Sequence, residues 1–276
     1  MSNEPGKCRD DEIYRYNERR WEAMVQANAL FTRPRLNLTP ESARAFVNAE
    51  GLLGELTGKS VLCLAAGGGQ QSAAFAILGA DVTVVDLAAG QLAKDQQAAA
   101  HYGTAVRTIK GDMRDLTGLP RRHYDVVWHP YSINFVPACA EVFGQVARVL
   151  KPGGIYYFMC ANPHALGMTE ADWTGDGYLL REPYQNGTPV LQPYQEFVFA
   201  DREAGSSVPP SLEYRHTLSS LVNGLANHGF QICSLTEVVN EAGDESHEPG
   251  TWDHFTTIVP PWWQFWCRYS GVGSVR

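Results

Sequence analysis

The sequence predicts an α/β fold, built on a doubly wound, mostly parallel sheet with helices on both faces. From Ser60 onward, short apolar runs rich in β-branched residues alternate with helical stretches, which is the pattern of βαβ units. Each run is almost continuously apolar, as expected for a parallel strand that is covered on both sides. A chain of 276 residues is long enough for one large domain of this kind with flanking and inserted segments.

The segment before the sheet predicts a helical cover. Between Asp11 and Phe31, apolar residues recur at helical spacing among charges, which predicts an amphipathic helix. Thr39, Pro40 and Glu41 then supply an N-cap, a first helical proline and an acidic first turn for a second helix. We therefore expect a helical cap segment at residues 1–58, followed by the main domain at residues 59–276.

Five strands and three intervening helices are expected next. The strands are Val61–Ala65, Val82–Val85, Ala105–Ile109, Tyr124–Trp128 and Ile155–Ala161, and the helices are Gln70–Leu78, Ala88–Tyr102 and Val136–Leu150. Gly79 and Gly103 stand where helix C-termini belong. The third helix ends at Lys151-Pro152, because a cation suits a helix C-terminus and proline prevents continuation.

The regular pattern stops between Asn162 and Leu212, in a stretch rich in Pro, Gly, Tyr and Asn. A structureless loop of this length is uncommon in a compact domain, so an insertion at about residues 162–213 is expected on the substrate side. Its best strand candidate is Glu196–Ala200. A helix is expected at Leu218–Asn227, and the runs Gln231–Val239 and His254–Val259 are expected to pair as an antiparallel hairpin.

Composition excludes several classes of protein. The formal net charge is −8, and no dense run of Lys and Arg offers a binding face for nucleic acid. No apolar run has the length of a membrane span, and the charged stretch Met1–Arg20 lacks the apolar centre of a secretory signal. The six cysteines are scattered without zinc-type spacing, so we expect a reduced, cytoplasmic protein that carries no metal.

Glycine and aspartate residues mark a candidate ligand site at the ends of three expected strands. The turn Gly67-Gly68-Gly69 lies between a strand and a helix, where backbone N–H groups can approach a ligand closely. Asp86 ends the second strand, where a carboxylate can accept hydrogen bonds from both hydroxyls of a ribose. Asp112, which follows the third strand, adds a second carboxylate to this edge. Each aspartate could equally serve as a turn or cap residue.

At this point the chain resembles the class I, Rossmann-like S-adenosylmethionine-dependent methyltransferases. The resemblance is carried, in order, by the glycine turn, Asp86, Gly111-Asp112, Tyr124-Asp125-Val126-Val127 and Arg148-Val149-Leu150-Lys151-Pro152-Gly153-Gly154. It covers Ser60–Ala161 closely and the tail Leu218–Val259 more loosely. It implies a seven-stranded sheet with a reversed last strand, cofactor over the first two strands and substrate over the fourth and fifth.

The resemblance also implies roles for individual residues. Gly67 and Gly69 match the glycines under the methionine moiety of S-adenosylmethionine, Asp86 the ribose acid, and Asp112 the partner of the adenine amino group, with Met113 beside the ring. The full expected set for this cofactor, and for its product S-adenosylhomocysteine, is Ala65, Gly67, Gly69, Gln71, Asp86, Leu87, Gly111, Asp112, Met113 and His129.

Two positions in the first strand and turn depart from the family pattern. The family usually has an acid where Cys63 stands and a glycine where Ala65 stands. Gln70 and Gln71 are candidates to replace the polar contacts of the missing acid. Polar residues at a helix N-terminus account for both glutamines equally well.

The acceptor side carries fewer signals. His129 ends the fourth strand and is a candidate general base, although a histidine at a strand end is often only hydrogen-bonded structure. Asn134 is a candidate to orient the substrate or to cap the next helix. Aromatic and polar residues outside the core suggest a covered pocket, and the expected substrate-binding residues are Tyr14, Tyr16, Trp21, Tyr131 and Asn162.

These observations predict a methyltransferase that acts on a small molecule, as a monomer or homodimer, without nucleic-acid or membrane partners. Two alternatives stay open at this stage. One is a nicotinamide-dependent oxidoreductase that uses the same strand–turn–helix unit, and the other is a non-catalytic cofactor-binding subunit.

Overall fold

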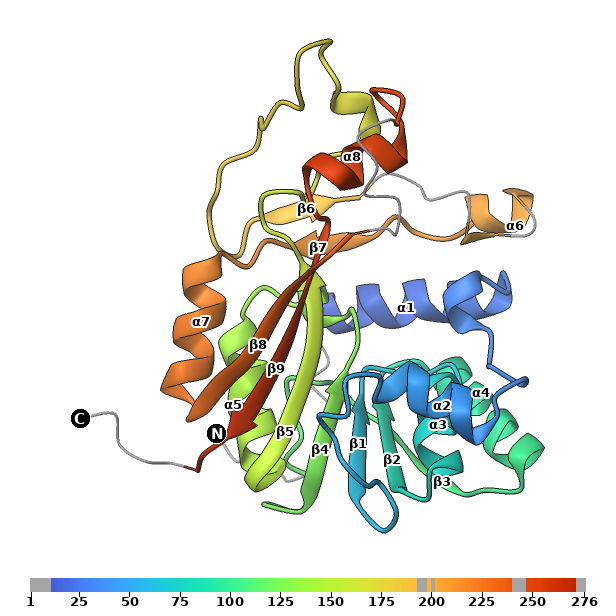
Figure 1. Cartoon of the computed structure of the whole chain (residues 1–276). Coiled ribbons are helices and arrows are strands. Elements are labelled where there is room, and N and C mark those ends of the chain that lie inside the picture. Colours follow the sequence, from blue (N-terminus) through green and yellow to red (C-terminus); the bar gives the residue numbers. More distant parts are fainter. Residues whose placement is uncertain (1–10, 193–197, 200–201, 240–246, 272–276) are drawn as a thin grey trace.

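The computed structural model describes residues 11–192, 198–199, 202–239 and 247–271 of the chain. Its centre is a seven-stranded sheet in this described part, with the order β3-β2-β1-β4-β5-β9-β8 (Figure 1). The strands are β1 (Ser60–Leu64), β2 (Asp81–Asp86), β3 (Val106–Lys110), β4 (Tyr124–His129), β5 (Leu150–Ala161), β8 (Phe230–Val238) and β9 (Trp262–Tyr269). The α/β fold and the mostly parallel sheet are thereby confirmed.

Strand β9 is the reversed strand that the resemblance implies. It pairs antiparallel with β5 on one side and with β8 on the other, whereas β1 to β5 all pair in parallel. The chain winds outward from β1 to β3 and then returns to β4 beside β1. This reversal leaves a crevice beyond the carboxyl ends of β1 and β4, which is where open α/β sheets bind ligands.

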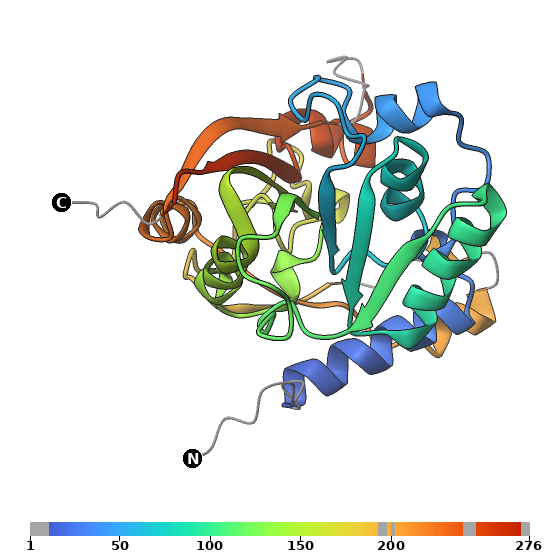
Figure 2. The ribbon, with the colours of Figure 1, turned by 90° about the horizontal axis from the view of Figure 1, so that it is seen from below.

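Helices cover both faces of the sheet (Figures 1 and 2). On one face, α2 (Pro40–Val47), α3 (Gln71–Ile77) and α4 (Ala89–Tyr102) pack on Val61, Cys63 and Val84. On the other face, α5 (Cys139–Val149) and α7 (Leu218–Asn227) pack on Leu62, Leu64 and Val127. Successive residues of β1 thus enter opposite cores, as the alternation of side chains along a strand requires.

Helix α1 (Glu12–Gln26) crosses the carboxyl end of the sheet, beneath a two-stranded sheet of β6 (Pro189–Leu191) and β7 (Leu212–Tyr214) (Figure 1). Asp11 caps α1 by accepting from the Tyr14 N–H at 2.9 Å. The Asn17 side chain donates to the Phe135 carbonyl at 3.0 Å, and Trp21 meets the Phe135 ring edge to face. Helix α1 is thereby fixed over the crevice.

The remaining elements are short. They are the 3-10 helices Leu30–Thr32, Ile133–Phe135 and Glu170–Asp172, and the helices α6 (Arg202–Ser206) and α8 (Trp252–Ile258). Most of the expected strand Glu196–Ala200 lies outside the described residues. Within the described part, none of the helices is both long enough and apolar enough to cross a membrane.

One expected strand is wrong. His254–Ile258 belongs to helix α8, which Thr251 caps by accepting from the His254 N–H at 3.3 Å. The antiparallel partner of β8 is β9 instead, and Trp263 and Trp266 of β9 lie buried in the central sheet. A run of only six residues fits a helix and a strand equally well, and here the cap decides for the helix.

Candidate active site

The carboxyl edge of the sheet holds a cavity of about 600 Å³. It runs from the turn after β1 to the space under the β6–β7 sheet, and α1 closes one side. Several expected site residues lie together on its wall. They are Ala65, Gly67, Gln71, Asp86, Leu87 and Met113 at the cofactor end, with Trp21 and Tyr131 farther along.

The turn after β1 brings backbone into direct contact with Asp86. The Gly67 N–H donates to Asp86 Oδ2 at 3.0 Å, and a Cβ on Gly67 would lie 2.6 Å from Gln91 Cβ. Only glycine fits this approach. Ala65 has a φ of +46°, a left-handed conformation that favours glycine, at the position where the resembled family has one.

Asp95 of α4 holds the rest of this turn, although nothing in the sequence singles it out. Its carboxylate accepts from the Gly68 N–H at 3.1 Å and the Gly69 N–H at 3.0 Å, and also from the Ser72 hydroxyl. Burial raises the pKa of Asp95 to about 7. Asp95 therefore holds the turn from α4, whereas the family places an acid at the position of Cys63. Gly69 is held by this bond and does not line the cavity.

Asp86 and Gln91 form the polar wall of the cofactor end. Asp86 accepts from the Ala88 N–H at 2.9 Å in addition to Gly67, and burial raises the pKa of its carboxyl to about 6. Gln91 is 3% exposed, and its Oε1 has no hydrogen-bond partner among the described residues. Two side chains with acceptor oxygens thus line the cavity, which fits a ligand that carries hydroxyl donors, such as a ribose.

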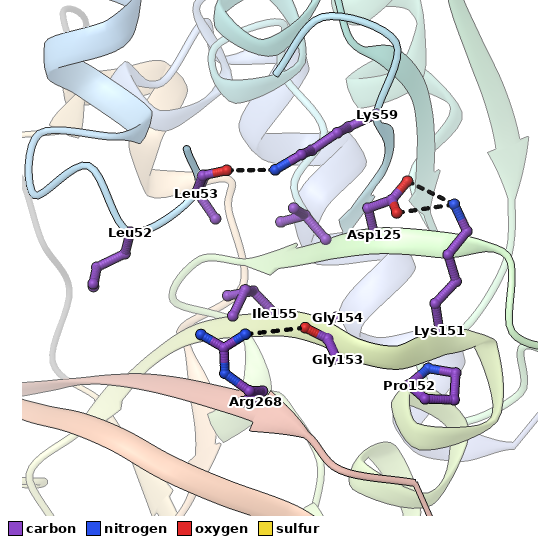
Figure 3. Close-up of a pocket in the computed structure, with 11 residues that line it drawn as sticks. Leu52, Leu53, Lys59, Asp125, Lys151, Pro152, Gly153, Gly154, Ile155 and Arg268 are labelled. Atoms are coloured by element: carbon purple, nitrogen blue, oxygen red, sulfur yellow. Dashed lines mark hydrogen bonds and ion pairs between the residues drawn. The ribbon is translucent and has the colours of Figure 1, made fainter. Parts of the chain in front are cut away.

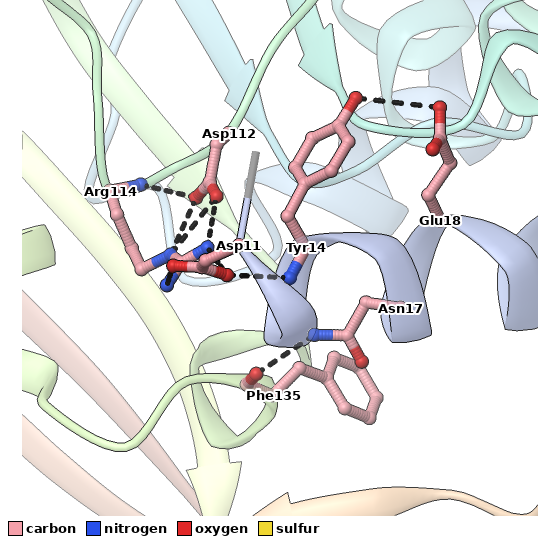
Figure 4. Close-up of polar contacts among 7 residues, drawn as sticks. All are labelled: Asp11, Tyr14, Asn17, Glu18, Asp112, Arg114 and Phe135. Carbon is pink, nitrogen blue, oxygen red and sulfur yellow. Dashed lines mark hydrogen bonds and ion pairs between the residues drawn. The ribbon is translucent and has the colours of Figure 1, made fainter. Parts of the chain in front are cut away.

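Asp112 is placed differently from the expectation. Arg114 binds both of its carboxylate oxygens, with Nη2 2.6 Å from Oδ2 and Nε 3.1 Å from Oδ1 (Figure 4). Arg114 also reaches Asp11 of the α1 cap at 2.8 Å. The Gly111 N–H donates to the Asp86 carbonyl at 3.0 Å, and neither Gly111 nor Asp112 lines the cavity. Asp112 therefore anchors Arg114, and through it α1.

The two candidate catalytic residues also lie off the cavity wall. His129 is fully buried, and its Nδ1 lies 2.9 Å from the Tyr156 hydroxyl. Burial lowers the pKa of His129 to about 3, so the ring stays neutral. Asn134 donates to the Tyr214 carbonyl at 3.1 Å and accepts from the Ala161 N–H at 2.9 Å. Both side chains form hydrogen bonds within the fold, and their catalytic roles stay predictions.

Three expected substrate-binding residues stand outside the cavity as well. The Tyr14 hydroxyl points to Glu18 at 3.4 Å, beside α1 (Figure 4). The Tyr16 hydroxyl donates to the Pro210 carbonyl at 2.8 Å. Asn162 donates to the Pro260 carbonyl at 2.8 Å, which links the end of β5 to the start of β9. These contacts hold the cover in place.

Polar residues that the sequence did not single out occupy the other end of the cavity. Glu213 of β7 and Ser211 line it together with Gln192 and with Arg20 of α1. Glu213 is only 4% exposed. The one available signal was a Glu flanked by Leu and Tyr in a stretch of unclear structure, which does not distinguish a buried acid from an exposed one.

A second, smaller pocket of about 280 Å³ lies at the opposite, amino end of the strands (Figure 3). Lys151 pairs with Asp125 at 2.8 Å, and Lys59 donates to the Leu53 carbonyl at 2.6 Å. Arg268 reaches the Gly153 carbonyl at 3.5 Å. These cations already have partners, and the pocket is remote from the glycine turn.

Comparisons with known proteins show that the chain is similar to methyltransferases. A family model described as a methyltransferase domain matches residues 62–158. The uncharacterized methyltransferase YbaJ of Bacillus subtilis is 32% identical over 185 residues, which are 66% of this chain and 69% of that protein. A ubiquinone biosynthesis O-methyltransferase from Cronobacter sakazakii is 30% identical over 174 residues, 63% of this chain and 70% of that protein.

The solved structures give the same result for the fold. A structure of an S-adenosylmethionine-dependent methyltransferase from Mesorhizobium loti matches with a TM-score of 0.59 at 20% identity. The match covers 85% of this chain and 100% of that one.

Proposed function

This chain belongs to the class I S-adenosylmethionine-dependent methyltransferases, and on that premise we propose that it methylates a small, largely apolar molecule held under α1 and the β6–β7 sheet. The observation that carries the proposal is the continuity of one cavity. It joins the glycine turn and Asp86 to an end walled by Tyr131, Phe135 and other apolar side chains. About 600 Å³ is within the usual range of small-molecule sites.

The residues present fit the donor. Asp86 and Gln91 Oε1, which has no partner in the described part of the chain, would accept from ribose hydroxyls, and Gly67 lets the turn pack closely against both side chains. Ala65, Gln71, Leu87 and Met113 would complete this end. The donor supplies a methyl group on a positively charged sulfur and is released as S-adenosylhomocysteine.

The cover contributes position and exclusion of water. Trp21 and Met24 of α1 lie over the cavity, and the β6–β7 sheet closes the other end. This arrangement supports the expected division into a cap segment at residues 1–58 and a substrate-side insertion at about residues 162–213. Holding donor and acceptor in line inside a dry cavity supplies much of the rate enhancement that such a transfer needs.

Calorimetry with S-adenosylhomocysteine tests this assignment. We expect Asp86→Ala to weaken binding by about 10–100-fold, the value of hydrogen bonds to a charged group. Asp81→Ala is the matched control, because Asp81 is exposed at the other end of β2. Binding of NADH in place of S-adenosylhomocysteine, or equal affinity in both variants, would contradict the assignment. Labelled S-adenosylmethionine and a metabolite extract would then identify the acceptor.

A further inference from the structure

We propose that Glu213 is the residue that binds and deprotonates the acceptor, and that the acceptor is a neutral alcohol or phenol with an apolar body. This inference rests on the proposed function, since it names the substrate class of the same cavity. It is carried by a cluster of polar groups from separate elements at the end of the cavity away from Asp86.

Glu213 is held by the hydroxyl groups of Tyr131 and Ser211 and by the Gln192 side chain, and it keeps capacity for a fourth partner. The Tyr131 hydroxyl donates to Oε2, and the Ser211 hydroxyl donates to Oε1 at 3.1 Å. The two carboxylate oxygens can together accept about four hydrogen bonds, so capacity for one from a ligand remains. Because Glu213 lines the cavity, that capacity faces the ligand space.

The fold does not need a carboxylate at this position. Backbone pairing of Val190 with Glu213 holds β6 and β7 together irrespective of the side chain. Burial raises the pKa of Glu213, which is the cost of placing an acid where only 4% of it is exposed. A raised pKa also makes a carboxylate a stronger base, and such groups concentrate at functional sites.

Charge in the cavity selects a neutral acceptor. Arg20 of α1 lies near Glu213, and its Nε is buried without a partner among the residues that the structure describes. An anionic acceptor would be repelled by Glu213. A cationic acceptor would be buried beside both Arg20 and the positive sulfur of the donor. A neutral molecule avoids both penalties.

The rest of the wall selects an apolar body. Apolar and aromatic side chains line the same cavity, from the end of β5, the segments after β4 and β5, α8 and the start of β9; they are Tyr131, Phe135, Met159, Ala161, Leu166, Met168, Trp252 and Trp262. A neutral hydroxyl group is a weak nucleophile until its proton is removed. The O–H proton passes to Glu213 while the oxygen bonds to the methyl carbon and the carbon–sulfur bond breaks. The products are a methyl ether, S-adenosylhomocysteine and protonated Glu213.

The first test uses 4-nitrophenol as the probe, because its absorption changes when it loses a proton. It is titrated into the protein saturated with S-adenosylhomocysteine, at a pH where the free compound is neutral. We expect the wild type to bind it as the phenolate. Glu213→Gln should lose the phenolate absorption and bind at least about 10-fold more weakly. Glu237→Gln, at an exposed position on β8, is the control and should match the wild type.

The second test measures methyl transfer from labelled S-adenosylmethionine to a set of neutral phenols and alcohols. Anionic benzoates and cationic benzylamines of similar size are the comparison compounds. With the best neutral substrate, Glu213→Gln should lower kcat by about 10²–10⁴-fold and leave the KM for the donor unchanged. The charged and titratable groups that face Glu213 in the described structure are Arg20 and Tyr131. Tyr131→Phe removes one donor, so its pH–rate profile should shift to higher pH even if Glu213→Gln does not fold.

Three results would overturn the inference. They are unchanged 4-nitrophenol affinity and spectrum in Glu213→Gln, preferred binding of benzoates or benzylamines, and the absence of binding by every neutral hydroxyl compound. If any of these results is obtained while S-adenosylhomocysteine still binds, it refutes the proposed acceptor class and leaves the proposed function intact. Loss of S-adenosylhomocysteine binding by the wild type would instead refute the proposed function.

Discussion

Replacement of Gly67 by alanine should damage the fold and the cofactor end together. A Cβ at this position would lie 2.6 Å from Gln91 Cβ, 2.9 Å from Asp86 Oδ2 and 3.1 Å from Asp86 Cγ. Carbon atoms in ordinary contact are about 3.5–4.0 Å apart, so the neighbours must move by roughly 1 Å. Gly67 does not use the left-handed region of φ, so the effect is steric and not due to backbone strain.

Overpacking of this kind costs about 1–3 kcal/mol of unfolding free energy. Displacement of Asp86 and Gln91 should also weaken S-adenosylhomocysteine binding by about 10–100-fold. Urea unfolding measures the first effect and calorimetry the second. Gly118→Ala is the matched control, because no atom lies within 4 Å of its Cβ position and its φ is not left-handed. It should change stability by no more than about 0.5 kcal/mol. If Gly67→Ala matches this control in both assays, the close packing of Asp86 and Gln91 against the glycine turn is refuted.

Three further outcomes follow from the polar contacts. His129 has a folded-state pKa of about 3, so the unfolded chain gains a proton that the native state does not as the pH falls below 6.5. Between pH 6.5 and pH 4 the wild type should therefore lose about 3 kcal/mol relative to His129→Gln in urea unfolding, and equal slopes would contradict the burial of a neutral ring. Asp11→Asn keeps an acceptor for the Tyr14 N–H and should cost at most about 1 kcal/mol. Asp11→Ala should lower the free energy of unfolding by about 1 kcal/mol more than Asp11→Asn. Equal losses in the two variants would show that the N-cap hydrogen bond does not stabilise the protein. Arg114→Met leaves Asp112 buried without its cation and should cost about 3–5 kcal/mol. Adding Asp112→Asn should recover a large part of this loss, and failure to do so would argue against the ion pair.

Hydrophobic periodicity predicted the helices and strands of the sheet because the pattern of each element lies within its own short stretch of sequence. The helix Leu218–Asn227 is confirmed at both bounds, and the five parallel strands lie within a few residues of their expected places. The glycine turn and Asp86 were found because neighbouring residues mark them. The prediction of the tail failed because His254–Val259 is short enough to fit either pattern.

The site residues that the sequence missed depend on distant contacts. Asp95 meets Gly68 from 27 positions along the chain, and Glu213 meets Tyr131 from 82. No spacing rule covers such separations. The resemblance implied a cofactor role for Asp112. In the structure Arg114, only two residues away, binds the Asp112 carboxylate, and the cofactor role stays a prediction.

The position of β9 constrains the order in which the sheet can form. Strand β9 follows β8 in the sequence but lies between β8 and β5 in the sheet. During synthesis, β8 therefore has no partner until residues 262–269 have left the ribosome, although α7 and the five parallel strands are already available. Until then the hydrogen-bonding edge of β5, with Tyr157 and Phe158, stays unpaired, and an open edge of this kind can pair with another chain. Docking of β9 thus completes the domain in a single late step, and a nascent chain stopped before Trp262 should be prone to aggregation.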